Sequence, residues 1–331
     1  MSELRQNIAT KEWVIIASER ARRPNSYAEP GDRILSEELP EYDAGCPFCP
    51  GNEEHDLEVE SIPELSNWQT RVVRNKYPAL MHEGMPDRFS NGVRRRIHGV
   101  GYHEVVVLHP KHNMTIALMR PWEVSMAFAT MQRRARVMAN DPRIEQIVIF
   151  KNHGQRAGAS LLHPHCQIIA LPVVPSNIRS RLEEARRYFD DNGHCIFRAI
   201  LEDELDSGER IVAMNEHFVA FVLYASASPF HMWIIPRQHR ASFQDASDEE
   251  IASLGEIMQN VLNRVYVGLR DPDYNFMIRS APIRDSRSIS FHWYISLVLR
   301  LSRVAGFELG SGMYINPTVP EVCAAFLRDL A

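Results

Sequence analysis

The sequence lacks an apolar run long enough to cross a membrane, because no stretch reaches the roughly 18 residues that a spanning helix needs. Its N-terminus also lacks the continuous apolar core of a signal peptide. Excess positive charge is lacking as well: the formal net charge is −5, which gives no general attraction to nucleic acid. We therefore expect a cytoplasmic protein whose partners include neither membrane nor nucleic acid, with the arginine cluster at 94–96 as solvated surface.

Cysteine is scarce, and its five residues are an odd number spread over a long chain, which argues against a disulfide framework. Cys46 and Cys49, however, form a CxxC pair flanked by glycine and proline, which can present two thiolates to one ion. Redox pairs use the same spacing, but the strand-then-helix setting of a thioredoxin site is missing. We expect a metal, zinc in the first place, although iron can occupy the same ligands.

The chain repeats its own plan. An apolar strand ending near a histidine, a helix and two further strands occur at 103–171 and again at 230–299. Four pairs of residues correspond at offsets of 127 to 129, namely His112 with His239, Lys151 with Arg279, His163 with His292 and His165 with Tyr294. The alternating runs around a helix predict an α+β fold of two halves, 1–175 and 176–331, whose antiparallel strands form one sheet flanked by helices.

Three polar side chains share one face of an expected strand. His163, His165 and Gln167 alternate in the sequence HPHCQ, so their side chains point to the same side. An isolated His-x-His is more often only a polar edge, but here a turn with two glycines, residues 152–160, immediately precedes it. Its amides and the Ser160 hydroxyl can cradle phosphate oxygens. We therefore expect an anion site that faces the histidines.

His165 is the expected nucleophile. A neutral imidazole can attack phosphorus without first losing a proton, provided that an acceptor such as a backbone carbonyl holds its other ring nitrogen. Gln167 can donate its amide hydrogens to a phosphoryl oxygen and stabilise charge in the transition state. Because Tyr294 stands in the second copy, only the first half carries an imidazole nucleophile.

Histidines must complete the tetrahedron that the CxxC pair begins. His112 and His163 are the best candidates, because both lie next to the expected catalytic strand. His55 and His109 remain alternatives. The predicted metal ligands are Cys46, Cys49, His112 and His163.

Several segments together resemble one family. They are ARRP at 21–24, CPFC at 46–49, NKYPAL at 75–80, HPKHNMT at 109–115, NHGQRAGASLLHPHCQ at 152–167 and AGFE at 305–308. In these segments the chain resembles galactose-1-phosphate uridylyltransferase and its nucleotidyltransferase relatives in the histidine triad superfamily. The resemblance covers nearly the whole chain and implies two tandem histidine-triad-like halves and a homodimer.

The resemblance also implies roles for single residues. His165 takes the nucleotidyl group, and the carbonyl of His163 orients its ring. The residues expected near the nucleotide and its phosphates are Asn75, Asn152, Gly158, Ser160, Gln167, Arg22 and Arg23. The implied zinc ligands are those that the spacing indicates. The residues of the C-terminal tail expected to bind the acceptor are Gly306, Phe307, Glu308, Gly310, Ser311 and Gly312.

The chain departs from the family pattern at three places. Lys76 stands where the best-known uridylyltransferases carry an acidic residue that binds ribose hydroxyls. In the second half Tyr294 follows His292 where some members carry a second His-x-His, so we expect no second metal. The tail after Glu308 reads LGSG, a turn that can accept a phosphate or another small anion instead of a hexose. This tail looks like that of relatives that move adenylyl groups to phosphate.

We therefore expect a nucleotidyltransferase with a ping-pong mechanism through His165. The first candidate reaction is UMP transfer from UDP-glucose to a hexose 1-phosphate. The alternative is AMP transfer from ADP-glucose or adenylylsulfate to phosphate, which Lys76 and the tail favour. Hydrolysis of the intermediate is a third outcome. The alternative outside the enzymes is a nucleotide-binding protein without turnover, and the intact His165 argues against it.

Overall fold

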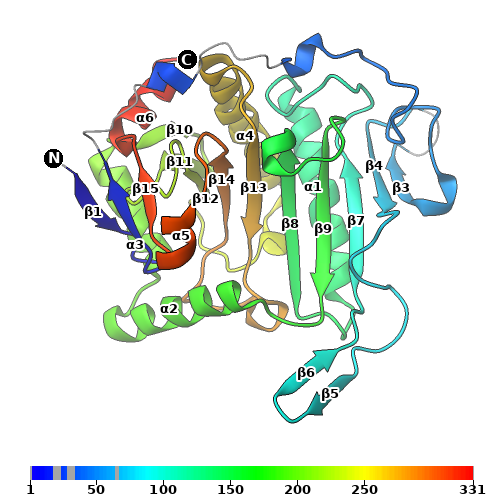
Figure 1. Ribbon diagram of the computed structural model, residues 1–331, viewed down its shortest axis with the longest axis horizontal. Coiled ribbons are helices and arrows are strands. Elements are labelled where there is room, and N and C mark those ends of the chain that lie inside the picture. Colours follow the sequence, from blue (N-terminus) through cyan, green and yellow to red (C-terminus); the bar gives the residue numbers. More distant parts are fainter. Residues whose placement is uncertain (1, 18–23, 28–33, 64–66, 331) are drawn as a thin grey trace.

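A ten-stranded antiparallel sheet forms the centre of the computed structural model, which describes residues 2–17, 24–27, 34–63 and 67–330 (Figure 1). Its strands, in spatial order, are β10 (Ile211–Met214), β11 (Phe218–Val222), β12 (Met232–Pro236), β14 (Tyr294–Leu299), β13 (Tyr274–Arg279), β8 (Gln146–His153), β9 (His165–Leu171), β7 (Tyr102–Val107), β4 (Thr70–Arg74) and β3 (Glu58–Ile62). Every neighbouring pair is antiparallel. The predicted α+β class and shared antiparallel sheet are confirmed.

The sheet is symmetric about the pairing of β8 with β13, which we call the seam. Outward from it come β9, β7, β4 and β3 on one side and β14, β12, β11 and β10 on the other. Corresponding strands also match in register, since Gln167 lies opposite Val105 in the first half and Ser296 lies opposite Trp233 in the second. The internal duplication is therefore confirmed, whereas the boundary at residue 175 stays a prediction.

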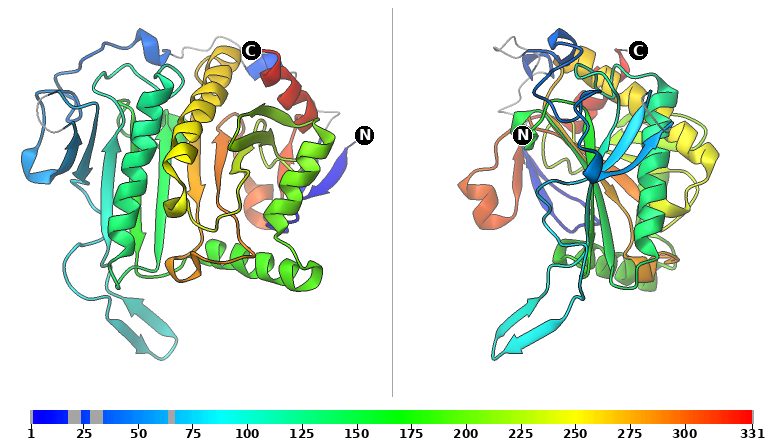
Figure 2. Two further views of the ribbon diagram at one scale, coloured as in Figure 1. Left: turned by 180° about the vertical axis from the view of Figure 1, so that it is seen from behind. Right: turned by 90° about the vertical axis from the view of Figure 1, so that its right-hand side faces the viewer.

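Two long helices, α1 (Pro121–Ala139) and α4 (Asp248–Leu269), lie side by side over one face of the sheet (Figure 2, left). Gly255 permits their close approach, because a Cβ there would lie 2.1 Å from the Ser125 hydroxyl oxygen. A capping box starts α4, in which Ser247 and Glu250 each accept the other's backbone amide. Their inner faces and the sheet enclose the largest apolar core. None of the helices in the described ranges is long and apolar enough to span a membrane.

The other face of the sheet differs between the halves. In the second half, α2 (Ser176–Asn192) and α3 (Ile196–Ser207) pack over it around Trp233 and Tyr294, whose ring centroids lie 4.2 Å apart. In the first half the corresponding face carries His165 and Gln167. The functional residues predicted on β9 are therefore on the face that α1 and α4 leave free.

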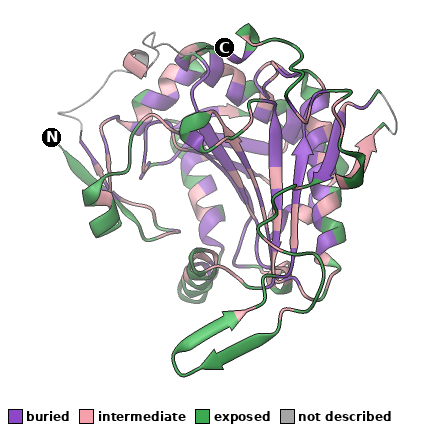
Figure 3. Cartoon of the chain, turned by 45° about the vertical axis from the view of Figure 1, so that its right-hand side comes forward, coloured by how far each residue is buried: buried purple, intermediate pink, exposed green. Residues whose placement is uncertain are grey.

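The remaining elements lie at the edges. β1 (Glu3–Gln6), β2 (Trp13–Ile16) and β15 (Tyr314–Asn316) form a small sheet in which β2 runs parallel to β15. Two short helices, α5 (Gly306–Ser311) and α6 (Pro320–Arg328), flank β15 in the chain. β5 (Arg88–Asn91) and β6 (Arg94–Ile97) form a hairpin that projects from the body (Figure 3). The arginines at 94–96 are exposed, as predicted.

Candidate active site and metal centre

His165 opens β9 and is buried, with 5% of its surface exposed. Its Nδ1 donates a hydrogen bond to the backbone carbonyl of His163 at 2.8 Å. Because a carbonyl can only accept, Nδ1 carries the proton and Nε2 keeps its lone pair. Burial, and then the nearby Lys151, lower the pKa of His165 to about 4, although the carbonyl acts in the opposite direction. The ring is thus held as a neutral tautomer with Nε2 unprotonated.

Two further residues position this ring, and neither is indicated by the sequence pattern. Lys151 on β8 is completely buried, and its Nζ donates to the backbone carbonyl of His165 at 3.2 Å. Burial lowers the pKa of Lys151. Phe48, between the two cysteines of the CxxC pair, packs with its ring centroid 5.4 Å from that of His165 and 6.0 Å from that of His163. The CxxC segment therefore contacts the predicted nucleophile directly.

Gln167 is held by His103, a third residue that sequence reasoning missed. The Ala79 amide donates to His103 Nδ1 at 3.1 Å, so the ring hydrogen is on Nε2, which donates to Gln167 Oε1 at 2.8 Å. The NH2 end of Gln167 stays available as a donor. Asn75 lies beside this pair, with its Nδ2 3.1 Å from His103 Nε2 and its Oδ1 accepting the Tyr77 amide at 2.8 Å. The sequence feature that could have indicated His103 is its place as a polar residue at the start of the apolar run 103–108.

The glycine-rich turn at 152–160 is built around a short 3₁₀ helix, Gln155–Ala157. Gly154 has φ +81° and ψ 161°, a combination that only glycine adopts without strain. A Cβ at Gly154 would also lie 2.4 Å from the Asp273 carboxyl carbon. Gly158 has φ +86°, and its amide donates within the turn to the Gln155 carbonyl at 3.0 Å. That amide already has an acceptor, while the Ser160 side chain beyond it is exposed.

Residues of the second half hold this turn in place. Asn275 on β13 donates from Nδ2 to Asn152 Oδ1 at 2.8 Å and to the Ala157 carbonyl at 2.9 Å. Asp273 accepts the backbone amide of Arg156 at 2.6 Å. Since β13 lies next to β8 at the seam, residues of the second half of the chain fix the turn of the first half. These contacts join residues more than a hundred positions apart, so no local pattern indicates them.

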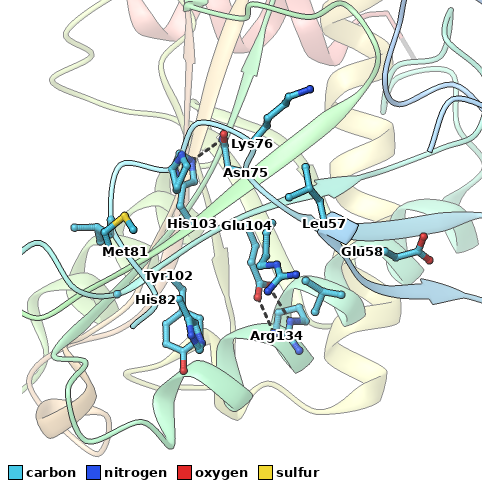
Figure 4. Close-up of a pocket in the computed structure, with 15 residues that line it drawn as sticks. Leu57, Glu58, Asn75, Lys76, Met81, His82, Tyr102, His103, Glu104 and Arg134 are labelled. Carbon is cyan, nitrogen blue, oxygen red and sulfur yellow. Dashed lines mark hydrogen bonds and ion pairs between the residues drawn. The ribbon is translucent and has the colours of Figure 1, made fainter. Parts of the chain in front are cut away.

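A cavity of about 480 Å³ opens beside Asn75 and Lys76 (Figure 4). Glu104 and Arg134 form a two-bond ion pair on its wall, with N–O distances of 2.8 and 2.7 Å. Lys76 is exposed at the rim, where its Nζ lies 2.9 Å from the Glu54 carboxylate. The cavity has a volume typical of sites for small organic ligands. Its further lining includes Leu57, Val59, Leu80, Met81, His82, Tyr102 and His103.

The four predicted metal ligands come together. One ligand atom each from Cys46, Cys49, His112 and His163 lies within 4.8 Å of all the others, and all four residues are buried. Cys49 Sγ is 3.6 Å from Nδ1 of either histidine. His163 Nε2 donates to the His109 carbonyl at 2.8 Å, so its unprotonated Nδ1 faces the sulfur. Burial raises the pKa of the Cys46 thiol to about 11. Two sulfurs and two imidazole nitrogens at these spacings fit a tetrahedral metal ion.

The alternative ligands lie elsewhere. His55 is exposed, and its Nδ1 lies 3.6 Å from the Glu58 carboxylate. The His109 ring lies beside Glu123, with Nε2 3.6 Å from the carboxylate. His109 instead contributes its backbone carbonyl to orient His163. The geometry therefore selects His112 and His163 from the candidates.

The tail predicted to bind the acceptor forms α5 and its C-terminal end. Ser311 donates from Oγ to the Phe307 carbonyl at 2.6 Å, and Gly312 ends the helix with φ +71°. The GSG sequence is thus a helix C-terminus and not an open turn. α5 lies on the β14 side of the seam, away from β9 (Figure 1), so the tail and His165 belong to opposite halves of the chain.

The second half keeps His239 and His292, the counterparts of the two metal histidines, and their rings stack with centroids 5.0 Å apart. Tyr294, the counterpart of the nucleophile, is completely buried in an apolar cluster. The imidazole of the predicted nucleophile thus corresponds to a packed phenol ring in the second half. The predicted phosphate contacts Arg22 and Arg23 lie outside the described residues.

Comparisons with known proteins bear on this site. The family model "Galactose-1-phosphate uridyl transferase, N-terminal domain" matches residues 1–175, and a domain of unknown function (DUF4921) matches residues 119–330. ADP-glucose phosphorylase of Arabidopsis thaliana is 34% identical, with 99% of this chain and 93% of that protein covered. Galactose-1-phosphate uridylyltransferase of Thermotoga maritima is 29% identical, with 99% and 98% covered. A crystal structure of an Arabidopsis thaliana ADP-glucose phosphorylase with bound ADP-glucose has a TM-score of 0.83 at 32% identity, with 100% and 99% covered.

The fold, the site and these relatives together define a nucleotidyltransferase made of two halves that repeat one strand order. The predicted class of enzyme is thereby confirmed. The chain belongs to the galactose-1-phosphate uridylyltransferase family, as the sequence segments indicated.

Proposed function

We propose that this enzyme transfers a nucleoside monophosphate through a covalent intermediate on Nε2 of His165. The observation that carries the proposal is the 2.8 Å hydrogen bond from His165 Nδ1 to the His163 carbonyl. It leaves Nε2 as the nucleophilic nitrogen. The same carbonyl stabilises the positive charge that the ring acquires when Nε2 forms its bond to phosphorus.

The reaction has two steps that mirror each other. In the first, the Nε2 lone pair attacks the α-phosphorus of a nucleoside diphosphate derivative, and the bond from phosphorus to the bridging oxygen breaks. The leaving phosphate takes that electron pair, so no general acid is needed. In the second, a phosphate oxygen attacks the same phosphorus, and the P–N pair returns to Nε2. Because the leaving group and the attacking group are both phosphates, one binding site can serve both steps.

Groups around His165 are proposed to bind the phosphates and the nucleoside. Gln167, oriented by His103, directs its NH2 toward a phosphoryl oxygen. Ser160 and Asn152 approach the phosphates from the glycine-rich turn. The nucleoside occupies the cavity beside Asn75, which leads away from β9 along β7 and β4.

For the substrates we propose ADP-glucose and inorganic phosphate, giving glucose 1-phosphate and ADP. The support is the 34% identity with a relative named ADP-glucose phosphorylase and the TM-score of 0.83 with its complex with ADP-glucose. Lys76 adds to this, because it replaces the acidic residue of the best-known uridylyltransferases. UMP transfer from UDP-glucose to a hexose 1-phosphate is the second candidate, supported by the 29% identical uridylyltransferase.

We propose zinc as the ion held by Cys46, Cys49, His112 and His163. A closed set of two thiolates and two imidazoles leaves no position for substrate, so the ion serves structure. It would fix His163, whose carbonyl orients His165. A homodimer, which could bring a partner's tail toward His165, and a cytoplasmic location remain the predictions made from the sequence.

The test is retention of label on the protein. The enzyme is mixed with ADP-glucose or UDP-glucose carrying ³²P at the α-phosphorus, and acid-labile, base-stable label is counted against released glucose 1-phosphate. We expect equal amounts of both from ADP-glucose, and release of the label as ADP when phosphate is added. His165→Ala should retain none, whereas His194→Ala, an exposed histidine on the second half, should behave as wild type.

Other outcomes are equally clear. Label from UDP-glucose alone would replace the adenylyl proposal by the uridylyl candidate. Product formation from either donor without any retained label would exclude the covalent intermediate. Nucleotide binding with neither label nor product would point to a binding protein.

A further inference from the structure

A second cavity, of about 220 Å³, lies in the second half of the chain. We call it the distal pocket and define it by its inner residues, which are Arg181, Ser228, His231, Arg279, Ser296 and Arg300. They come from α2, the loop before β12, β13, β14 and the residue after β14. No ligand-binding role was predicted for these inner residues, although Glu308 at the rim belongs to the tail expected to bind the acceptor, and the cavity lies across the seam from His165.

The distal pocket is the counterpart of the catalytic region. Ser296 corresponds to Gln167, because each lies opposite the equivalent residue of the neighbouring strand, Trp233 in one half and Val105 in the other. Two positions before these residues stand His231 and His103. His231 Nε2 lies 2.9 Å from Ser296 Oγ, which repeats the contact of His103 Nε2 with Gln167 Oε1 at 2.8 Å. Arg279 stands where the first half has a buried lysine. The second half has therefore kept a polar site while losing the nucleophile.

Positive charge in the distal pocket is not balanced by protein carboxylates. Among the described residues, none forms an ion pair with Arg181, Arg279 or Arg300. Arg181 donates to the Tyr294 hydroxyl at 3.4 Å and Arg300 to Asn275 Oδ1 at 2.5 Å, which are neutral acceptors. Burial, and then Arg181, lower the pKa of Arg279, yet a guanidinium stays protonated in proteins. Three half-buried cations around one small cavity, without an ion-paired carboxylate, favour the binding of an anion.

The two carboxylates at the rim are engaged elsewhere. Glu12 accepts a hydrogen bond from the Thr10 hydroxyl at 2.9 Å. Glu308 accepts the Ala305 amide at 2.9 Å at the start of α5. Glu12 favours the charged form of Arg279 from a distance, but in the described part of the chain neither carboxylate reaches an arginine of the pocket within ion-pair distance. The rim also carries Arg303, whose side chain is exposed.

Buried polar atoms in the distal pocket lack partners. Ser228 Oγ, His231 Nδ1 and Arg279 Nε are inaccessible to solvent and have no hydrogen-bond partner among the described residues. Ser228 is only 8% exposed. Buried donors and hydroxyls of this kind are normally satisfied. These atoms make the wall of the pocket polar, so a ligand with acceptor oxygens suits it, with its direct contacts on the accessible ends of the guanidinium groups.

We propose that the distal pocket binds a phosphate dianion, either free or as the terminal group of a small monoester. Guanidinium groups and hydroxyls are the usual partners of phosphate oxygens. The pocket is smaller than the roughly 300 to 1,000 Å³ of sites for larger organic ligands, which favours a small anion over a nucleotide. Because Tyr294 stands in place of a nucleophile, the phosphate is bound and not transferred. The proposal does not depend on the chemistry at His165.

The experiment is equilibrium dialysis of the full-length protein against ³²P-orthophosphate at constant ionic strength. The variants are Arg181→Gln alone and combined with Arg279→Gln, and the matched control is Arg198→Gln, an exposed arginine on α3. Arg300 is left intact because it holds Asn275. We expect one class of phosphate sites to weaken about 10- to 100-fold in the double variant. The control and the labelling of His165 by its nucleotide donor should not change.

Several outcomes separate the possibilities. Only the class of sites that the double variant weakens is compared, because the site at His165 is also proposed to bind both compounds. Displacement of that label by glucose 1-phosphate identifies a monoester site, whereas displacement by orthophosphate alone identifies a site for the free anion. If the double variant fails to fold, Arg181→Gln and the charge-retaining Arg279→Lys still decide the question, with weakened and largely retained binding expected respectively. Unchanged phosphate affinity in folded Arg181→Gln and double-variant proteins would overturn the proposal. Displacement by chloride at equal ionic strength would do so as well.

Discussion

His103 donates its Nε2 hydrogen to the Oε1 atom of Gln167 across 2.8 Å, and the Ala79 amide fixes the tautomer that makes this possible. The bond has one consequence for the ligand side of Gln167. With Oε1 engaged, the amide cannot turn its oxygen toward a phosphate, where it would repel the charge. His103 is therefore a positioning residue for the NH2 group that we propose to contact the phosphoryl oxygens.

Removing this hydrogen bond should slow transfer more than it weakens binding. In His103→Ala we expect kcat to fall roughly 10- to 100-fold with a smaller change in KM, because Gln167 acts on charge that develops in the transition state. His103→Gln, which can place an NH2 near the former Nε2, should recover part of the rate. His98→Ala is the control, because His98 is exposed next to the β5–β6 hairpin and away from Gln167. A fall in kcat that is accompanied by a marked fall in thermal stability would instead indicate a purely structural role.

Substitution of Gly154 should distort the glycine-rich turn. Alanine meets a φ and ψ of +81° and 161° and places its Cβ 2.4 Å from Asp273, so we expect Gly154→Ala to lower the free energy of unfolding by about 2–4 kcal/mol. Label retention on His165 should also be lost. Gly193→Ala is the matched control, since Gly193 has φ +75° but open space around its Cβ position. Urea unfolding checks both, and equal effects would refute the clash.

Loss of one thiolate should release the metal. We expect Cys49→Ser to reduce bound zinc from about one equivalent per chain and to lower the free energy of unfolding by several kcal/mol. Labelling of His165 should fall with the metal, because His163 orients it. Cys195→Ser is the control, since Cys195 is buried outside the metal centre, beside the Ser290 carbonyl. Wild-type protein purified without chelator but free of any metal would contradict the assignment.

One buried carboxylate predicts how stability depends on pH. Burial raises the pKa of Glu204 to about 7 against the opposing ion pair with Arg210. The folded protein thus keeps a proton that the unfolded chain releases near its ordinary pKa of 4.5. The contribution to stability is complete below pH 4.5 and is lost as the pH rises through 7, by up to about 3 kcal/mol.

The measurement is the free energy of unfolding in urea between pH 5 and 8. Glu204→Gln should flatten this pH dependence, whereas Glu202→Gln, an exposed carboxylate on the same helix, should leave it intact. The same slope in wild type and Glu204→Gln would show that other groups cause it.

The sequence carries the local parts of this site well. Alternation places His165 and Gln167 on one face of β9, and the preference for His112 and His163 over His55 and His109 agrees with the cluster around the CxxC pair. It does not carry contacts that depend on strand order. Asn275 reaches the glycine-rich turn only because β13 pairs with β8, and Lys151 reaches the His165 carbonyl only across β8 and β9.

Local patterns can also point to the wrong conformation. The GSG sequence at 310–312 has the composition of a turn, but hydrogen bonding within the chain makes it the end of α5. Lys151 and Arg279 correspond in the repeat, yet nothing in their spacing distinguishes a lysine beneath a nucleophile from an arginine in a second cavity. Burial decides that difference, and burial depends on how α2 covers only one half.

The seam between β8 and β13 also determines what happens when the chain is divided. Cutting it between β9 and α2 would leave two pieces, each with a long, unpaired edge strand whose only natural partner is the other piece. Such edges aggregate when nothing covers them. When the two pieces are produced together, they should pair again through β8 and β13 and restore the sheet. Enzyme activity would then measure their association, as in a split reporter enzyme.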